Sequence, residues 1–217
     1  MAYQMVHLEI AYRLLDKFKW IEKPADFMLA SLAPDSVHFH PEYDVSLKEA
    51  SHIWNCGPKW GITIESDKWK ANAISFWELH KNDENRDFMA GYCAHILTDW
   101  LNDLRIWAPF REKIIKGADR EELYKIYSKE AIGSDIWLHQ QSRNCKEIMK
   151  LLSEGRAYSI KGCVWKADIE AQREYIINEQ YKDKEIIDIS GYSYCSREII
   201  ESFIDECIEL LSEILYL

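Results

Sequence analysis

Glycine and proline are scarce in this chain, which contains 8 Gly and 5 Pro among 217 residues. Their scarcity excludes a collagen-like repeat, a glycine-rich linker array and a disordered tail, because all three depend on residues that break regular structure. No stretch approaches the ~18 uninterrupted apolar residues of a membrane-spanning helix. The first residues do not form a basic region followed by an apolar one. We therefore expect a cytoplasmic protein with long helices and no transmembrane segment.

The cysteines lack the spacing of a metal-binding or disulfide-rich protein. The chain has six, and none of them belongs to a C-x-x-C pair: Cys56, Cys93, Cys145, Cys163, Cys195 and Cys207. Such wide spacing is typical neither of a thiolate zinc site nor of a tight disulfide framework. We expect reduced, partly buried thiols.

Positive charge is also in short supply, with 27 Lys and Arg against 37 Asp and Glu and a formal net charge of −10. This excess of negative charge would repel a phosphate backbone, so non-specific binding to duplex nucleic acid is not an expected function. Against this acidic background the chain carries 9 Trp and 7 His. That combination fits either an ordinary core and surface or a buried metal site.

Apolar residues recur at three- and four-residue steps along most of the chain, which predicts an all-α protein, a multi-helix bundle. A length of 217 residues favours one domain over residues 1–217. The expected helices span residues 3–18, 24–32, 46–54, 66–80, 83–115, 119–152, 166–180 and 196–217. We expect a loop at residues 36–46, and irregular or short extended segments at 156–165 and 186–194.

The segment 83–115 is predicted to be a helix buried at the centre of the domain, because its apolar residues surround nearly the whole helical circumference. His95 and Asp99 share a polar face of this helix, with Cβ atoms expected about 5 to 6 Å apart. Such a pair could grip one zinc ion or form a structural hydrogen bond. A buried carboxylate is costly without a partner, which favours the metal. Gly91, on the same face, would let another segment approach.

Three more residues have ligand-type side chains. His7 lies on the apolar side of the first predicted helix, Asp35 follows Pro34 just after the second, and His52 lies near the end of the third. Taken alone, His7 could be a core histidine and Asp35 a turn or cap residue. Periodicity leaves the role of His52 undecided.

The order of these residues resembles that of the bacterial zinc-dependent phospholipase C family, whose fold is shared by zinc-dependent single-strand nucleases. The resemblance covers roughly residues 1–107 and is carried by His7, Ala33-Pro34-Asp35, Ser51-His52 and Gly91-Tyr92-Cys93-Ala94-His95-Ile96-Leu97-Thr98-Asp99-Trp100. It implies one zinc held by Asp35, His52, His95 and Asp99, and a second held by His7 and bridged by Asp99. The metal-site half would be about residues 1–115, and a helical C-terminal half about 116–217.

Two zinc ions are expected rather than three. Secreted members of the family hold a third zinc with a further histidine soon after the H-x-x-x-D pair, and they use a processed N-terminal Trp as a ligand. Here the chain begins with Met1, and the residues that follow Asp99 are Trp-Leu-Asn-Asp-Leu-Arg. The expected ligands are nitrogen and oxygen without sulfur, which is typical of a catalytic zinc site.

The resemblance implies a zinc-dependent phosphoesterase, a phospholipase C-like hydrolase that uses a metal-bridging hydroxide to cleave a small-molecule or lipid phosphate ester. Asp35 is the expected catalytic residue, accepting or orienting the proton of the attacking water. Two other functions stay open. One is a single-strand nuclease or nucleotidase-like activity, and the other is a non-catalytic helical protein that binds a structural metal or a partner.

The remaining candidates have two interpretations each. Five tryptophans could line a mouth for acyl chains or nucleobases, although core packing is the simpler interpretation: Trp54, Trp60, Trp69, Trp77 and Trp100. Asp103 and Asp135 could add carboxylate ligands but are expected to be surface acids. Four histidines need no special role: His38, His40, His80 and His139. The C-terminal half is expected to be an ordinary helical layer, with a lid or partner surface as the alternative.

Overall fold

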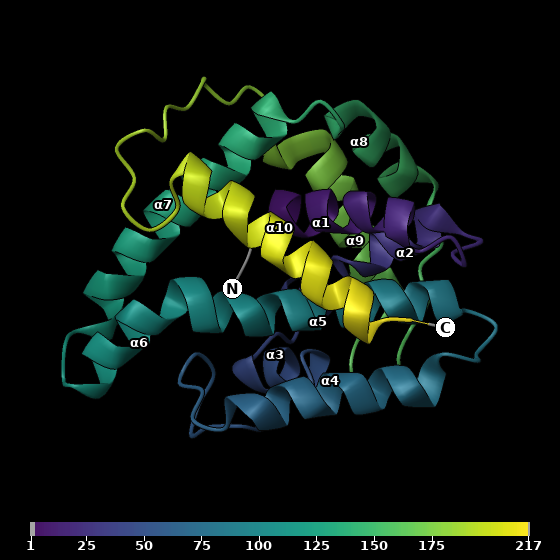
Figure 1. Ribbon diagram of the computed structural model, residues 1–217, viewed down its shortest axis with the longest axis horizontal. Helices are drawn as coiled ribbons and strands as arrows, with labels where there is room; N and C mark the ends of the chain where they lie inside the picture. The colour runs from purple at the N-terminus through teal and green to yellow at the C-terminus, as the bar shows by residue number, and fades with distance from the viewer. Residues whose placement is uncertain (1–2, 217) are drawn as a thin grey trace.

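The computed structural model describes residues 3–216, and α-helices account for most of this range (Figure 1). The ten α-helices of this range are α1 (Gln4–Lys17), α2 (Pro24–Ala30), α3 (Val45–Ser51), α4 (Ser66–His80), α5 (Arg86–Asn102), α6 (Ala108–Ile115), α7 (Arg120–Gln141), α8 (Cys145–Glu154), α9 (Lys166–Tyr175) and α10 (Arg197–Ile214). Residues 3–216 contain no β-strand, only an isolated antiparallel bridge between Ile160 and Val164. The all-α prediction is confirmed.

Helix α5 runs through the centre of the molecule, with α1 and α2 on one side, α4 on another and α10 crossing in front (Figure 1). All of its residues from 87 to 102 are buried, as the apolar pattern around its circumference predicts. A polar side chain on this helix therefore faces other protein groups rather than bulk water.

Gly91 allows helix α2 to approach α5 closely. A Cβ atom at this position would lie 2.2 Å from the backbone oxygen of Phe27 and 2.9 Å from the Cβ of Ala30, both on α2. Any larger residue would push the two helices apart. The predicted close approach at Gly91 is confirmed, and the segment that approaches is α2.

The connection after α2 differs from the expected loop. Residues Ala33–Phe39 form a 3₁₀ helix, η1, with Pro34 in its first turn, where the missing N–H of proline has no cost. Helix α3 then begins at Val45 and not at Ser46, because the side chain of Asp44 caps it by accepting a hydrogen bond from the Ser46 N–H (2.6 Å). The residues 33–39 are therefore ordered as a 3₁₀ helix, although their sequence shows no helical periodicity.

Two of the predicted helices contain a π-helical turn, one in the interior and one at the C-terminal end. Asp103–Trp107 (η2) separates α5 from α6, and Ile176–Gln180 (η3) extends α9. Pro109 cannot donate a backbone hydrogen bond and its ring crowds the carbonyl group four residues earlier, which accounts for the widened turn before α6. The predicted helix 119–152 is likewise divided, into α7 and α8.

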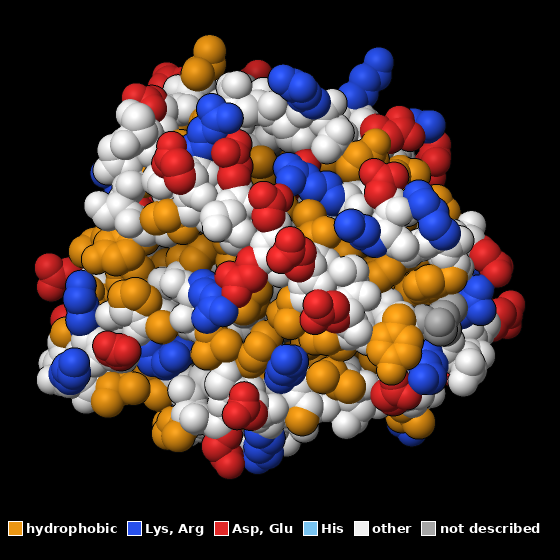
Figure 2. Space-filling model, viewed as in Figure 1, with side chains coloured by type: hydrophobic (Ala, Val, Ile, Leu, Met, Phe, Trp, Pro, Cys, Tyr) orange, Lys and Arg blue, Asp and Glu red, His pale blue; other side chains and the backbone are white. Residues whose placement is uncertain are grey.

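The surface carries both signs of charge. Figure 2 shows acidic and basic side chains interspersed with apolar patches over the face that includes α10. Among residues 3–216, no helix is both long enough and apolar enough to cross a membrane. All six cysteines carry free thiols, four of them buried.

Candidate metal centre

Helix α5 places His95 and Asp99 one turn apart on the same buried face. The Nδ1–H group of His95 donates a hydrogen bond to the backbone oxygen of Ser31 (2.7 Å), the residue that ends α2. A carbonyl group at a helix end has no partner within its own helix, so it is free to accept this bond. The contact fixes the imidazole ring and leaves Nε2 facing Asp99.

His52 reaches the same place from the C-terminal end of α3. Its Nδ1 contacts the hydroxyl of Ser51 (2.9 Å) and the backbone oxygen of Lys48 (3.1 Å), so its Nε2 also points away from the helix. The next residue, Ile53, has a φ of 52°, which is rare for a β-branched side chain. The chain turns sharply here, and the indole N–H of Trp69 holds the turn by donating to the His52 carbonyl (2.8 Å).

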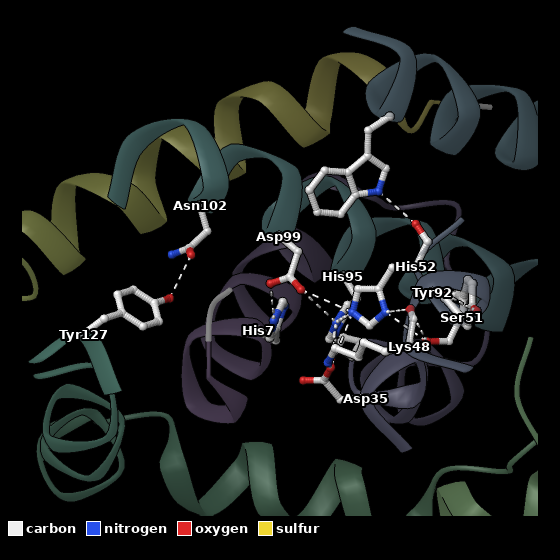
Figure 3. A network of polar contacts seen from close by, with 12 residues as sticks. His7, Asp35, Lys48, Ser51, His52, Tyr92, His95, Asp99, Asn102 and Tyr127 are labelled. Carbon is white, nitrogen blue, oxygen red and sulfur yellow. Dashed lines mark hydrogen bonds and ion pairs between the residues drawn. The ribbon is translucent and has the colours of Figure 1, made fainter. Parts of the chain in front are cut away.

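Asp35 enters from η1 and faces both histidines. Its Oδ1 lies 3.4 Å from Nε2 of His52 and 3.8 Å from Nε2 of His95. The same oxygen accepts a hydrogen bond from the ammonium group of Lys48, which is buried on α3. Figure 3 shows these side chains converging from separate helices on one point.

The four ligand-type atoms all lie within 4.8 Å of one another, and five of their six separations are close to those of a tetrahedral site. Nε2 of His52 lies 3.2 Å from Nε2 of His95 and 3.2 Å from Oδ2 of Asp99, while Nε2 of His95 lies 3.7 Å from that oxygen. In a tetrahedral zinc site with bonds of about 2.0 to 2.2 Å, neighbouring ligand atoms lie about 3.3 to 3.6 Å apart. Asp35, His52, His95 and Asp99 form a group that could hold a metal ion.

The chemistry of the donors also fits a cation. The Nδ1 of His95 faces a carbonyl oxygen, which can only accept, so this nitrogen carries the ring proton and a neutral His95 presents an Nε2 lone pair to the cluster. The Nε2 of His52 and the carboxylates of Asp35 and Asp99 lie around that lone pair. Acceptor atoms that converge in a buried space repel one another unless a cation lies between them. A divalent metal ion would satisfy all four.

The electrostatics keep the ligands in their metal-binding protonation states. Burial alone would raise the pKa of Asp35, but Lys48 and the two imidazoles outweigh it and hold this pKa well below its usual range. Burial is likewise outweighed at Asp99, where hydrogen bonds with His52 and His7 keep the pKa well below its usual range. Burial, reinforced by His7, lowers the pKa of His95. Ionised carboxylates and neutral histidine are the forms that bind metals.

His7 lies beside this group but outside it. Its ring stacks on the His95 ring, with centroids 3.8 Å apart, and its Nε2 lies 3.4 Å from Oδ1 of Asp99. The two oxygens of Asp99 therefore face different histidines, as a bridging carboxylate would. His7 is not part of the four-residue group that could hold a metal ion. The second zinc stays a prediction.

A pocket opens beside the cluster. It is lined by Tyr3, Gln4, Asp35, His38, Lys48, Tyr124 and Tyr127, and its volume is about 330 Å³. This is at the lower end of the ~300 to 1,000 Å³ that is typical of small-ligand sites. Asp35 belongs to both the cluster and the pocket, which makes it the link between a bound metal and a ligand.

Of the seven pocket residues, only Asp35 was predicted from the sequence as a site residue, and the two basic residues near the cluster are Lys48 and His38. A lysine in an exposed-looking helix carries no sequence signal of burial, and Lys48 is buried where α3 packs against η1. Burial and the charge of Lys48 lower the pKa of His38 to about 4. The other histidines bind elsewhere: His40 to Asp168 (2.9 Å) and His80 to Asp83 (2.7 Å), while His139 stacks on Tyr181.

Some of the five tryptophans pack in the core or bond to the backbone, and others line a cavity. Trp77 is buried in the core, and Trp100 donates from its indole N–H to the backbone oxygen of Ser66 (3.0 Å). Trp54, Trp60 and Trp69 line a second, aromatic cavity. Trp60 also meets the His52 ring edge to face, with centroids 4.9 Å apart, which connects this cavity to the cluster.

Asp103 and Asp135 are not the surface acids that we expected. Asp103 is buried against Arg111, which donates to its carboxylate. Asp135 is buried under α1 and accepts the backbone N–H of Met5 (2.6 Å). The charge of Arg111 compensates the burial of Asp103. The backbone N–H of Met5, in the first turn of α1 where it has no partner within the helix, compensates the burial of Asp135.

Comparison with protein-family models, curated proteins and solved structures finds no match for this chain. The resemblance to zinc-dependent phospholipase C therefore stays a prediction. The fold itself provides a buried cluster of two aspartates and two histidines that could hold a metal ion, beside a pocket of ligand size.

Proposed function

We propose that this protein is a zinc-dependent phosphoesterase that hydrolyses a small-molecule or lipid phosphate ester. The observation that carries the proposal is the spacing of the four cluster atoms, 3.2 to 3.8 Å in the five separations given above. Asp35, one of the four residues, opens directly into the adjoining pocket.

Zinc is the metal that this donor set favours. Two imidazole nitrogens and two carboxylate oxygens suit zinc, whereas magnesium and calcium prefer oxygen ligands alone. The short separations also favour four-coordinate geometry over the wider spacing of calcium sites. His7 and Asp99 supply two donors toward the second zinc of the proposal.

Hydrolysis would depend on a bound zinc ion and on three residues of this chain, His52, His95 and Asp35. A bound zinc ion would supply Lewis-acid stabilisation of the phosphoryl oxygens and acidify a water molecule. His52 and His95 are held in place by backbone carbonyls, which fixes the direction of both nitrogens. The carboxylate of Asp35, ionised and facing the pocket, would accept or orient the proton of the attacking water.

One observation favours a different function, a structural metal site. Four protein ligands complete a tetrahedron, and structural zinc sites are closed in this way, whereas catalytic ones keep a position open. His52, His95 and Asp99 are almost fully buried. Catalysis at this cluster therefore requires Asp35 to share its place with water or substrate, and its position at the pocket makes it the ligand able to do so.

Hydrolysis of bis(4-nitrophenyl) phosphate tests the proposal. We expect activity in zinc-loaded protein that disappears on chelation, returns with zinc and is absent in His52→Ala. Phosphatidylcholine micelles and a single-stranded oligonucleotide then separate a phospholipase-like from a nuclease-like substrate range. Protein that holds its zinc and cleaves none of the three substrates would contradict the proposal and favour the structural metal site.

A further inference from the structure

Lys48 is a positively charged residue in a buried position, where charged side chains are rare. Its side chain is 2% exposed, and its ammonium group donates to Oδ1 of Asp35. A buried ammonium group needs compensation, and Asp35 supplies it. Asp35 is also a cluster residue, so Lys48 lies one hydrogen bond away from the candidate metal position.

The Lys48 ammonium group has more N–H donors than the one hydrogen bond to Asp35 uses. It carries three N–H groups, and Asp35 is the acceptor that it reaches among residues 3–216. On another side, the nitrogen lies 5.6 Å from the centre of the Trp60 ring, a cation–π contact. Lys48 also lines the tyrosine-rich pocket. An acceptor that enters this pocket would find an N–H group available.

The pocket otherwise offers little positive charge. Tyr3, Gln4, Tyr124 and Tyr127 are neutral polar side chains, and the lowered pKa of His38, about 4, leaves its ring neutral near pH 7. Of the pocket residues that the structure describes, Lys48 is the one with a permanent positive charge. An anion drawn into the pocket would therefore be drawn to Lys48 and to a metal beside it.

Charge balance depends on whether the cluster holds a metal ion. The carboxylates of Asp35 and Asp99 together with the Lys48 ammonium carry one net negative charge. A divalent cation changes this to one net positive charge, which complements a phosphate oxygen. Without the lysine the loaded site would be neutral. Lys48 thus decides whether the loaded site attracts an anion.

We propose that Lys48 is an oxyanion-binding residue, which donates one N–H to Asp35 and another to an anionic oxygen of a phosphate-type ligand when a divalent metal ion occupies the cluster. The inference rests on the metal-binding part of the proposed function and does not require hydrolysis. It identifies the floor of the tyrosine-lined pocket as the place where the phosphate group binds.

Thermodynamic linkage makes the inference measurable. If the metal creates the binding site for the anion, the anion must strengthen binding of the metal by the same factor. We expect inorganic phosphate to raise the zinc affinity of the wild-type protein by about tenfold, within the usual range of such couplings. In Lys48→Met the enhancement should fall below about twofold, while zinc binding without phosphate persists.

Competition with a chromophoric chelator, at matched ionic strength with and without phosphate, measures these affinities. Lys48→Arg should retain the enhancement because it keeps the positive charge. Lys70→Met is the matched control, since the Lys70 ammonium lies over Trp100 at 4.9 Å, away from the cluster. Circular dichroism verifies the fold of each variant, and Lys48→Gln provides a second uncharged side chain.

Tryptophan emission gives a readout that needs no lysine substitution. Phosphate should change the emission of zinc-loaded wild-type protein, and Trp60→Phe should remove that change because Trp60 lies against the Lys48 ammonium. Chelated protein should show no response to phosphate. A response that is unaltered in Trp60→Phe would overturn the inference.

The outcomes separate this inference from the proposed function. Equal enhancement by phosphate in Lys48→Met and wild type, or none in zinc-loaded wild type, would overturn the role of Lys48 even if the protein hydrolyses phosphate esters. Enhancement that depends on Lys48, in a protein that hydrolyses none of the substrates, would support the inference and contradict the phosphoesterase proposal.

Discussion

The Nε2 atoms of His52 and His95 lie 3.2 Å apart, and the Nδ1 atom of each ring contacts a backbone carbonyl group. Because its Nδ1–H is used at Ser31, a neutral His95 ring presents an Nε2 lone pair beside the carboxylates of Asp35 and Asp99, and such a group of acceptors is unfavourable unless a cation binds among them. The fold holds both rings in place from separate helices. A metal ion is thus the group that would stabilise this arrangement.

Substitution of cluster residues should abolish metal retention. We expect His95→Ala and Asp99→Asn to lower zinc affinity by more than about 100-fold, because loss of a direct ligand should cost at least as much as loss of the groups that orient it. His139→Ala is the control, since His139 stacks on Tyr181 away from the cluster. Chelator competition measures the affinities. Equal retention in the three variants would show that the ligand assignment is wrong.

His7 should matter for a second zinc and not for the first. His7→Phe preserves an aromatic ring to stack on His95 and removes the nitrogen that faces Asp99. We expect this variant to keep one zinc per chain and to lose the second. Metal analysis after gel filtration measures the stoichiometry. A variant that still binds two ions would exclude His7 as a ligand.

Gly91→Ala should destabilise the protein and weaken the site together. The added Cβ would lie 2.2 Å from the Phe27 backbone oxygen, so α2 must move, and overpacking of this kind costs about 1 to 3 kcal/mol. Because Ser31, the C-cap residue of α2, accepts the hydrogen bond that holds His95, zinc affinity should fall as well. Urea denaturation and chelator competition test the two effects. Gly191→Ala, where a Cβ meets no neighbour within 4 Å, should change neither.

Asp135 should make stability depend on pH. Burial raises its pKa from 3.8 to about 6, although Tyr181 and the Met5 N–H donate hydrogen bonds that oppose the change. The folded state therefore holds the proton more tightly than the unfolded state. The stabilising contribution is complete below pH 3.8 and is lost as the pH rises through 6.

Comparison with Asp135→Asn isolates this effect. The free energy of unfolding of the wild type, relative to the variant, should fall by about 3 kcal/mol across that interval. Urea denaturation of zinc-free protein over a pH series provides the measurement. A difference between wild type and variant that stays constant with pH would contradict the raised pKa.

Strong helical periodicity made most of the fold predictable. Helix α4 begins and ends at the predicted residues, and α5 is buried on all sides as its apolar pattern indicates. Boundaries set by single contacts were not predictable. Asp44 caps α3 one residue before the predicted start, and Pro109 follows a π turn inside the predicted helix 83–115. Caps and π turns depend on neighbours that periodicity ignores.

The candidate site was predictable where its residues share a helix or a motif. The four-residue spacing of His95 and Asp99 placed them on one face, and the resemblance added Asp35 and His52, which the structure brings within reach of both. Lys48 could not be predicted, because its burial against Asp35 depends on how α3 packs against η1. A tertiary contact of this kind leaves no periodic signal in the sequence.

The metal content of the untagged protein shows whether the cluster binds zinc. We expect at least one equivalent of zinc per chain by elemental analysis, lost in Asp99→Asn and restored to metal-stripped wild type by added zinc. Less than one equivalent in the wild type, with no recovery when zinc is supplied, would contradict zinc binding at the cluster.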